Sequence, residues 1–249
     1  MPGNILIPKN LNTLSDFAAS NVLLAFDYDG TLAPIASAPA AARMRAATRR
    51  WLTRVALLYP CVVISGRPLD DLTRRLSRIP VWYLFGTHGL EPHAGSDEHA
   101  TRVKKWVHQL SEQLPRQHGL VIEHKKYSVT VHFRGVRNRK QVMESIADAV
   151  AQLADVRSIG GARAINLLPV GGADKGVAVQ KARRMFACDT VIYVGDDETD
   201  EDAFASAPPD RLLAIRVGGR GATRAGYRLR SQREIDLLLR QLLRLRAKR

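Results

Sequence analysis

Two aspartates, Asp27 and Asp29, directly follow an apolar run from Val22 to Phe26. A buried strand is stabilised by removing apolar surface from water, whereas a carboxylate is destabilised there unless a charge or a donor pairs with it. Other polar groups stand at the ends of other apolar or helical runs: Ser65-Gly66-Arg67, Lys175 and Gly195-Asp196-Asp197. Any one of these is ordinary turn or cap chemistry, but their recurrence predicts a functional site.

The aspartates are expected to hold a cation. Asp27, Asp29 and Asp196 would repel one another without one, and hard oxygen ligands without thiolates indicate Mg²⁺. Side chains of an extended segment alternate, so Asp27 and Asp29 lie on one side and Tyr28 on the other. If the site transfers a phosphoryl group, Asp27 is placed to attack phosphorus as the nucleophile. Asp29 is placed to protonate the oxygen of the leaving group and later to deprotonate the attacking water.

The remaining groups suit a phosphate. Lys175, the Ser65 hydroxyl and the backbone N–H groups near Gly30 and Thr31 match the non-bridging oxygens of a phosphoryl group. The Thr31 hydroxyl either binds the phosphate or stabilises the turn. A cation, a carboxylate nucleophile and a phosphate cradle together predict phosphoryl transfer through an aspartyl-phosphate.

The elements that must position these residues alternate between strands and helices. Short apolar runs predict buried strands at Val22–Phe26, Cys61–Ile64, Val81–Phe85, Val191–Val194 and Leu212–Val217. Helical patterns cover Ala40–Leu58, Pro68–Ser77 and Asp174–Phe186. This alternation predicts an α/β fold, a Rossmann-like parallel sheet that binds its ligand beyond the carboxyl ends of the strands.

A last helix is predicted near the end of the chain. Ser231 and Glu234 have capping-box spacing, and leucines at helical intervals are expected in the core: Leu237, Leu238, Leu242 and Leu245.

The middle of the chain has a different pattern. Ser128–Phe133 alternates, which predicts a strand with one buried and one exposed face. Around it we expect, in order, helix Thr101–Leu114, strands Leu120–His124 and Ser128–Arg134, helix Arg137–Leu153, and strands near Val156–Ile159 and Arg163–Leu168. The sequence therefore predicts an α/β unit at 96–169 inserted into a core formed by 1–95 and 170–249, with hinges within 91–100 and 169–176.

Composition bounds the class of protein. The 249 residues are 45% hydrophobic, enough for a sizeable core. No apolar run reaches the roughly 20 residues of a membrane span, and the N-terminus lacks the layout of an export signal, so a cytoplasmic protein is expected. Cys61 and Cys188 are predicted to be buried free thiols.

The net charge of +14 is concentrated near the C-terminus, where residues 211–249 hold twelve Arg and Lys but two acidic residues. A basic segment attracts phosphates, acidic membranes and nucleic acids, and it is equally typical of a solvated helix face. Because no nucleic-acid fold motif accompanies it, no specific nucleic-acid partner and no membrane partner is expected.

The motifs resemble those of the haloacid dehalogenase-like phosphatases. DYDGT (27–31), Ser65, Lys175 and GDDETD (195–200) follow one another in the order of that superfamily. The chain is most similar to the trehalose-6-phosphate phosphatase family, through DYDGTLAPI (27–35), SGR (65–67), GTHGLE (86–91) and GDDETDEDAF (195–204). The family's Glu-x-Lys and His-x-Arg patterns are similar to Glu123-His124-Lys125 and His132-Phe133-Arg134.

The resemblance implies a role for each matching residue. Asp27 is the nucleophile, Asp29 the acid/base, and Ser65 with Lys175 holds the phosphate. Mg²⁺ is held by Asp27, Asp196 and the backbone carbonyl of Asp29, with Asp197 and Asp200 behind these ligands.

The inserted unit resembles the family's C2-type cap, which closes over the sheet edge and binds the sugar. Alternation alone would make its polar residues a solvated face. The resemblance makes the following residues substrate ligands: Arg67, His88, Glu91, Glu123, Lys125, His132, Arg134 and Asn166.

Asn166 departs from the family pattern. It stands in Asn166-Leu167-Leu168-Pro169, where the family usually has a glutamate in a Glu-x-x-Pro string. If the substrate is the same, loss of one charge-assisted contact would weaken sugar binding by roughly 1.5–3 kcal/mol. Alternatively, the asparagine indicates that the substrate is a different glycosyl phosphate.

Two classes of function follow. The leading hypothesis is a Mg²⁺-dependent phosphoric monoester hydrolase, a monomer or small homo-oligomer, that acts on trehalose 6-phosphate; sucrose 6-phosphate and mannosylglycerate phosphate are alternatives. The competing hypothesis is a non-catalytic binding protein that uses the basic C-terminal segment.

Overall fold

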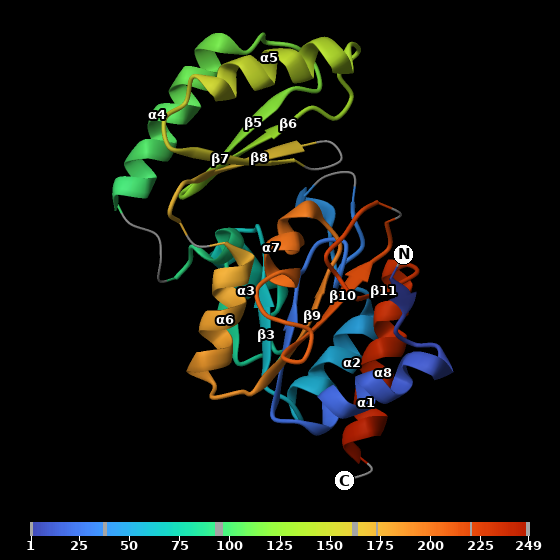
Figure 1. Ribbon diagram of the computed structural model, residues 1–249. Helices are drawn as coiled ribbons and strands as arrows, with labels where there is room; N and C mark the ends of the chain where they lie inside the picture. Colours follow the sequence, from blue (N-terminus) through green and yellow to red (C-terminus); the bar gives the residue numbers. More distant parts are fainter. Residues whose placement is uncertain are drawn as a thin grey trace. The chain divides into compact units, whose positions relative to one another are not determined.

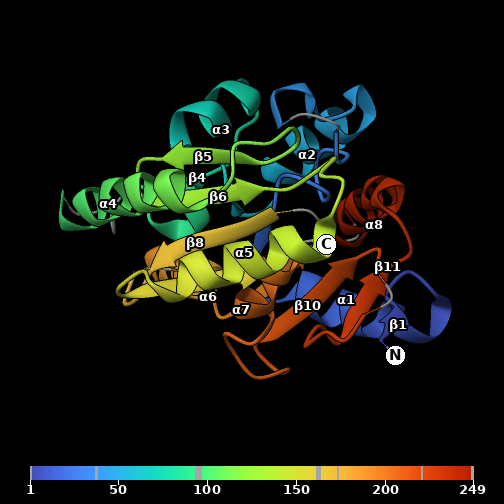
Figure 2. The ribbon, with the colours of Figure 1, turned by 90° about the horizontal axis from the view of Figure 1, so that it is seen from above.

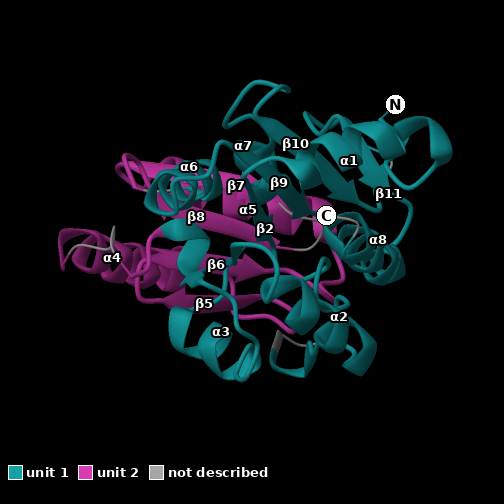
Figure 3. Ribbon diagram, turned by 90° about the horizontal axis from the view of Figure 1, so that it is seen from below, with its two compact units in different colours: residues 1–89, 174–249 teal, residues 90–173 magenta. Residues whose placement is uncertain are grey.

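The computed structural model describes residues 2–36, 39–92, 97–160, 164–172, 174–219 and 221–247. The chain divides into two compact units, unit 1 (residues 1–89 and 174–249) and unit 2 (residues 90–173) (Figures 1 and 3). Parts of both predicted hinges, 93–96 and 173, lie outside the described residues. The functional division into a catalytic core and a cap stays a prediction.

Unit 1 is built on a parallel sheet, which confirms the predicted fold class. The strand order is β1 (Gly3–Asn4), β11 (Tyr227–Leu229), β10 (Leu212–Val217), β9 (Thr190–Gly195), β2 (Val22–Phe26), β3 (Cys61–Ile64) and β4 (Tyr83–Phe85). Strands β2, β3 and β10 have the predicted bounds, β9 is one residue longer at each end, and β4 begins two residues late. Strands β1 and β11, from opposite ends of the chain, lie side by side (Figure 2).

Helices cover both faces of this sheet (Figure 1). Within β2, Val22, Leu24 and Phe26 pack on one face and Leu23 and Ala25 on the other, because strand side chains alternate. The first face packs against helices α1 (Leu11–Ala19), α2 (Ala46–Ala56), α3 (Leu69–Arg75) and α8 (Ile235–Ala247). The second face packs against α6 (Lys175–Met185) and α7 (Glu201–Phe204).

Short 3₁₀ helices connect these elements: η1 (Pro8–Asn10), η2 (Pro39–Ala41), η3 (Thr87–Gly89), η4 (Glu198–Asp200) and η5 (Gln232–Glu234). One of them, η2, replaces the first turn of the helix predicted at 40–58. Residues 42–45 have no regular secondary structure, Ala42 and Met44 are buried there, and Arg45 is extended, so α2 begins only at Ala46. The predicted cap of α6 is confirmed, since the Asp174 side chain accepts the Val177 N–H at 2.9 Å.

The predicted capping box before α8 is wrong. Ser231 makes no capping hydrogen bond with its side chain. Glu234 instead accepts from the backbone N–H of Arg230 at 2.7 Å and from the Asn4 amide at 3.1 Å, which ties α8 to β1. Leu238 and Leu242 are fully buried as expected, but Leu237 is 48% exposed.

Arginines of α8 pack against aromatic rings. The Arg240 guanidinium lies 5.5 Å from the centre of the Trp51 ring of α2, and that of Arg246 lies 4.5 Å from the centre of the Tyr59 ring. Cation–π contacts of this kind stabilise the packing of the two helices, so part of the basic C-terminal segment has a structural role.

Unit 2 consists of two helices on an antiparallel sheet (Figures 1 and 2). The strand order is β5 (Val121–Lys125), β6 (Ser128–His132), β8 (Ala164–Pro169) and β7 (Val156–Gly160). Helices α4 (Asp97–Gln113) and α5 (Arg139–Ala151) cover one face, where Trp106 and Ile146 pack against Val129 and Val131 of β6.

The opposite face of this sheet carries polar residues. The register pairs Glu123 with Thr130 and Thr130 with Asn166, and directly paired residues share a face. Ser128 and Thr130 are only 1% and 3% exposed, so the expectation of an exposed face on this strand is wrong. Side chains of the neighbouring strands flank this face, Glu123 of β5 and Asn166 of β8 on either side of Thr130, and the Thr130 hydroxyl donates to Asn166 Oδ1 at 2.9 Å.

Both cysteines, Cys61 and Cys188, are buried and free, as predicted. None of the helices in the described part of the chain has the length and apolar character that a membrane span requires.

Substitution of Leu238 by alanine tests the packing of α8. Leu238→Ala should lower the free energy of unfolding by about 2–5 kcal/mol, because it leaves a cavity in the core of unit 1. The neighbouring Leu237→Ala, at an exposed position, should change it by less than about 0.5 kcal/mol. Urea unfolding measures both, and equal losses would contradict the placement of α8.

Candidate active site

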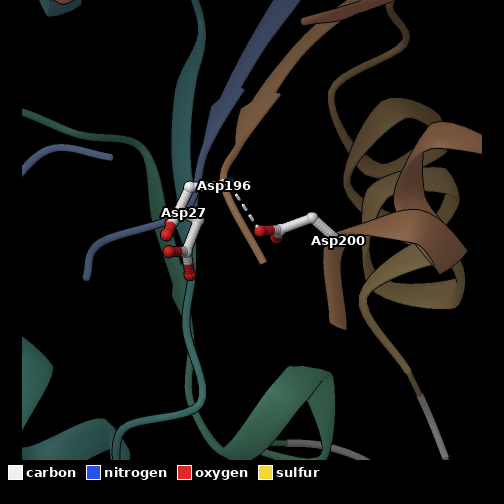
Figure 4. A group of neighbouring side chains, drawn as sticks. All are labelled: Asp27, Asp196 and Asp200. Atoms are coloured by element: carbon white, nitrogen blue, oxygen red, sulfur yellow. Dashed lines mark hydrogen bonds between the residues drawn. The ribbon is translucent and has the colours of Figure 1, made fainter. Parts of the chain in front are cut away.

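Three segments of unit 1 bring charged side chains together at one edge of the sheet. Asp27 follows β2, Asp196 follows the neighbouring strand β9, and Lys175 is the first residue of α6. The Lys175 ammonium donates to Asp27 Oδ1 at 2.8 Å and to Asp200 Oδ1 at 2.7 Å. The carboxylates of Asp27, Asp196 and Asp200 turn toward one another, each with an oxygen within 4.8 Å of the others (Figure 4).

Asp200 is fully buried and saturated with donors. Its Oδ1 accepts from Lys175 and from the Tyr193 hydroxyl, both at 2.7 Å. Its Oδ2 accepts the backbone N–H groups of Asp196 at 2.8 Å and Asp197 at 2.9 Å. Because each oxygen of Asp200 already accepts two hydrogen bonds, it has little remaining capacity to bind a metal ion. The geometry fits a structural role, in which Asp200 holds Lys175 and the Asp196 loop in place.

The remaining carboxylates are poorly compensated. Burial raises the pKa of Asp27 to about 8, with Lys175 opposing the rise and Asp200 adding to it. Burial and the charges of Asp27 and Asp200 likewise raise the pKa of Asp196. Burial alone would lower the pKa of Lys175, but the two carboxylates outweigh it and raise that pKa. In the described part of the chain, one ammonium faces two buried carboxylates and a half-buried one, which leaves this site short of positive charge.

The donor set fits a hard divalent cation. Carboxylate oxygens without thiolates suit Mg²⁺, and a cation would relieve the repulsion between Asp27 and Asp196. Gly30, with φ of 81°, allows the chain to pass directly against the Asp196 carboxylate; a Cβ atom there would lie 2.0 Å from Asp196 Oδ2. Thr31 Oγ1 donates to Asp196 Oδ1 at 3.2 Å, so in this structure the threonine orients the carboxylate.

Asp29 lies outside this cluster. Its two carboxylate oxygens accept from Nε and Nη2 of Arg67, each at 2.6 Å, while Nη1 of Arg67 donates to Asp71 at 2.8 Å. The intervening Tyr28 is buried in the core of unit 1 and does not face solvent. Asp29 is therefore held by an arginine that the resemblance had made a substrate ligand.

The loop after β3 is supported from behind by η3. Ser65 is buried, its hydroxyl accepts the Arg67 N–H at 3.2 Å, and its carbonyl accepts the His88 N–H at 2.9 Å. Thr87 and His88 have φ of 46° and 58°, which is strained for residues with a Cβ atom. The His88 ring lies against Gly66, where a Cβ atom would come within 2.6 Å of it. His88 thus packs beneath the loop that carries Ser65.

The predicted sugar ligands of unit 2 form part of a network on the polar sheet face. His132 Nε2 lies 2.8 Å from Glu123 Oε2, and Lys125 Nζ lies 3.7 Å from the same oxygen. The His132 hydrogen bond and the Lys125 charge outweigh burial and lower the pKa of Glu123. Arg134 is exposed in the turn after β6, and Glu91 is half-buried in the segment before α4. Their roles as ligands stay predictions.

Sequence reasoning missed two residues that support the site: Tyr193, which bonds to Asp200, and Asp71, which shares Arg67 with Asp29. Tyr193 carried a usable signal, because it is the one phenol in an otherwise apolar strand run. Asp71 had none, since an acidic residue in the first turn of a helix is ordinary.

Comparison with solved structures places the fold. The chain matches the C-terminal domain of Candida albicans trehalose-6-phosphate phosphatase with a TM-score of 0.77, 23% identity and 98% of each chain covered. It matches a sugar phosphatase of the HAD superfamily with a TM-score of 0.59, 13% identity and coverage of 87% of this chain and 96% of the other. The fold is that of the haloacid dehalogenase-like (HAD) superfamily.

Comparison of sequences identifies a narrower group of proteins than comparison of folds does. The trehalose-phosphatase family model matches residues 25–231, and the trehalose-phosphate phosphatase of Mycobacterium avium (strain 104) is 36% identical over 194 residues. This chain belongs to the trehalose-phosphatase family. That alignment covers 72% of this chain and 49% of the relative, so the chain spans about half the length of the curated relative.

Replacement of Asp200 tests the buried charge network. Asp200→Asn removes one of the two carboxylates that neutralise Lys175, so we expect the free energy of unfolding to fall by about 3–5 kcal/mol. Glu198→Gln, at an exposed position of the same turn, is the matched control and should change it by less than about 0.5 kcal/mol. Urea unfolding at neutral pH measures both.

Asp27→Asn sharpens this test, because it removes a carboxylate whose charge is disfavoured by burial. In the presence of a chelator it should not lower the free energy of unfolding. A loss as large as that of Asp200→Asn would contradict the different environments of the two carboxylates.

Proposed function

We propose that this chain is a Mg²⁺-dependent phosphatase that hydrolyses trehalose 6-phosphate to trehalose and inorganic phosphate. Membership of the trehalose-phosphatase family supports the substrate. The observation that carries the reaction is the convergence of Asp27, Asp196 and Lys175 from separate segments on one edge of the sheet. We further propose that the protein acts in the cytoplasm as a monomer or small homo-oligomer.

The first half of the reaction transfers the phosphoryl group to the protein. A carboxylate oxygen of Asp27 forms a bond to phosphorus, and the bond from phosphorus to the sugar oxygen breaks. Asp29 gives its proton to that departing oxygen, so the sugar leaves as an alcohol. Lys175 and the Ser65 hydroxyl hold the non-bridging oxygens.

The second half releases phosphate. Asp29, now a carboxylate, takes a proton from water as the water oxygen bonds to phosphorus and the bond to Asp27 breaks. Asp27 is thereby restored as a carboxylate and Asp29 as the protonated acid. Asp27, Asp196 and the backbone carbonyl of Asp29 would hold Mg²⁺, which when bound keeps the carboxylates ionised and offsets the charge of the phosphoryl oxygens.

Sugar recognition is assigned to the polar sheet face of unit 2. Glu123, Lys125 and His132 form one network there, and Asn166 shares the face through Thr130. Charged groups that already bond to one another are pre-oriented donors and acceptors for sugar hydroxyls. Asn166, in place of the family glutamate, makes another glycosyl phosphate the second candidate substrate.

A phosphate-release panel tests reaction and substrate together. Purified protein with Mg²⁺ should release phosphate from trehalose 6-phosphate at a higher kcat/KM than from glucose 6-phosphate, sucrose 6-phosphate or mannosylglycerate phosphate. Asp27→Asn should lower kcat by more than about 10³-fold, because the nucleophile is lost. Asp210→Asn, at an exposed loop position, is the matched control and should retain activity.

Different outcomes separate the alternatives. A preference for another sugar phosphate would reassign the substrate. Absence of metal-dependent turnover, together with tight and salt-sensitive binding to DNA or RNA, would replace the enzyme by a binding protein. Substantial turnover by Asp27→Asn would refute the assigned nucleophile.

The raised pKa of Asp27 predicts pH-dependent metal binding. Because that pKa is about 8 in the folded protein rather than 3.8, the metal-free folded state holds a proton that the unfolded chain has lost, and its stability falls as pH rises through this window. Mg²⁺ must displace the proton, so its apparent dissociation constant should rise up to about tenfold per pH unit below about pH 8. Calorimetric titration in buffers of different ionisation enthalpy counts the released protons. A dissociation constant that is independent of pH would contradict this account.

A further inference from the structure

Arg67 lies between two carboxylates and holds both. Its Nε and Nη2 donate to the two oxygens of Asp29, each at 2.6 Å, and its Nη1 donates to Asp71 at 2.8 Å. The side chain of Arg67 is 9% exposed, whereas that of Asp29 is 39% exposed. A buried cation thus reaches outward to a carboxylate that remains accessible.

The position of the guanidinium is fixed from several directions. Asp71 is also held by Arg75 Nε at 2.7 Å, so it provides a stable anchor for Arg67. The Tyr28 ring lies under the guanidinium, with its centre 5.5 Å from Cζ. The backbone of Arg67 is bound at both ends, by the Ser65 hydroxyl at 3.2 Å and by the Thr87 N–H at 2.8 Å. This much support exceeds what a surface ion pair has.

We propose that Arg67 is a positioning residue that fixes the carboxylate of Asp29 for proton transfer. The inference rests on the proposed function, in which Asp29 gives a proton to the departing sugar oxygen and then takes one from water. A bidentate fork sets both the location and the rotation of the carboxylate plane, which a single hydrogen bond does not do. Each carboxylate oxygen keeps a further lone pair for the transferred proton.

The same contacts argue against direct substrate binding by Arg67. Nε, Nη1 and Nη2 each have a carboxylate partner, and a phosphate would have to compete with Asp29 and Asp71 for them. Arg67 therefore acts on the substrate through Asp29.

Dependence on the leaving group separates this role from a structural one. A sugar alkoxide is a poor leaving group and needs a proton as the bond to phosphorus breaks, whereas a nitrophenolate leaves without one. Asp29 also activates water in the second half of the reaction, which is the same for every substrate, so only the first half separates the two leaving groups. Misplacement of Asp29 should slow release of the sugar in that step and have little effect on release of a nitrophenolate. Damage to the fold or to the phosphate cradle would slow both.

The experiment compares the single-turnover rate constant for leaving-group release from trehalose 6-phosphate and from 4-nitrophenyl phosphate in Arg67→Gln and Arg67→Lys. We expect this rate constant to fall by about 10²-fold for the sugar phosphate and by less than about 5-fold for the aryl phosphate. Arg67→Lys keeps the charge but lacks the fork, so it should show the same selectivity. Asp29→Asn is the reference for complete loss of the acid and should show the larger difference between substrates.

Arg78→Lys is the matched control. Arg78 is an exposed arginine after the end of α3 and takes no part in the described contacts that hold Asp29 and Asp71, so its replacement should leave the ratio of the two rate constants unchanged. Circular dichroism and thermal unfolding check that each variant is folded, and Arg67→Lys provides the comparison if Arg67→Gln is not.

Two results would overturn the inference: equal losses of this rate constant on both substrates in the Arg67 variants, or weaker binding of the sugar phosphate with an unchanged rate constant, which would make Arg67 a substrate ligand. Failure of the proposed function has a different signature. If the wild-type protein does not hydrolyse the sugar phosphate, or if Asp29→Asn slows release of both leaving groups equally, the assigned reaction or the acid role of Asp29 fails before Arg67 is considered.

Discussion

The ammonium of Lys175 is the interaction on which the site depends. It is buried and bonds to Asp27 and Asp200, which come from different ends of the chain and meet only when β2 and β9 pair. A buried carboxylate without such a partner would be strongly destabilising. Lys175 therefore permits carboxylates at the sheet edge, whereas Asp196 beside them is bonded by the hydroxyl of Thr31.

The fold treats these carboxylates unequally. Asp200 receives donors from Lys175, Tyr193 and two backbone N–H groups, which fix its position and leave it little capacity for other ligands. Among the described residues, the Asp27 carboxylate accepts from Lys175, and that of Asp196 accepts from the weaker donor Thr31. The number of hydrogen-bond donors therefore distinguishes Asp200, which has a structural role, from Asp27 and Asp196, whose oxygens can still coordinate a metal ion, although all three lie within one small cluster.

The sequence predicts the strands of the sheet more accurately than it predicts the contacts between side chains. Strands β2, β3 and β10 matched their predicted bounds because an apolar, β-branched run between turn residues has few other interpretations. The predicted start of helix α2 and the predicted cap of α8 were wrong, because tertiary contacts outweigh the local patterns there. Met44 is buried in irregular chain before α2, and Glu234 accepts a hydrogen bond from Asn4. The convergence of Asp27, Lys175 and Asp196 followed from sheet topology, whereas the partners of Asp29 required side-chain geometry.

Asp27 and Asp29 are held by arrangements of the same form. Lys175 joins Asp27 to Asp200, and Arg67 joins Asp29 to Asp71. In each case the cation is shared between an aspartate with a proposed chemical role and a second aspartate that anchors it. The cation types differ in a way that fits those roles. An ammonium is a compact charge that makes a single contact with Asp27 and leaves its other oxygen open for a bond to phosphorus, whereas a guanidinium grips both oxygens of Asp29 and fixes its orientation. Exchange of the two cations would therefore block the nucleophile and loosen the acid.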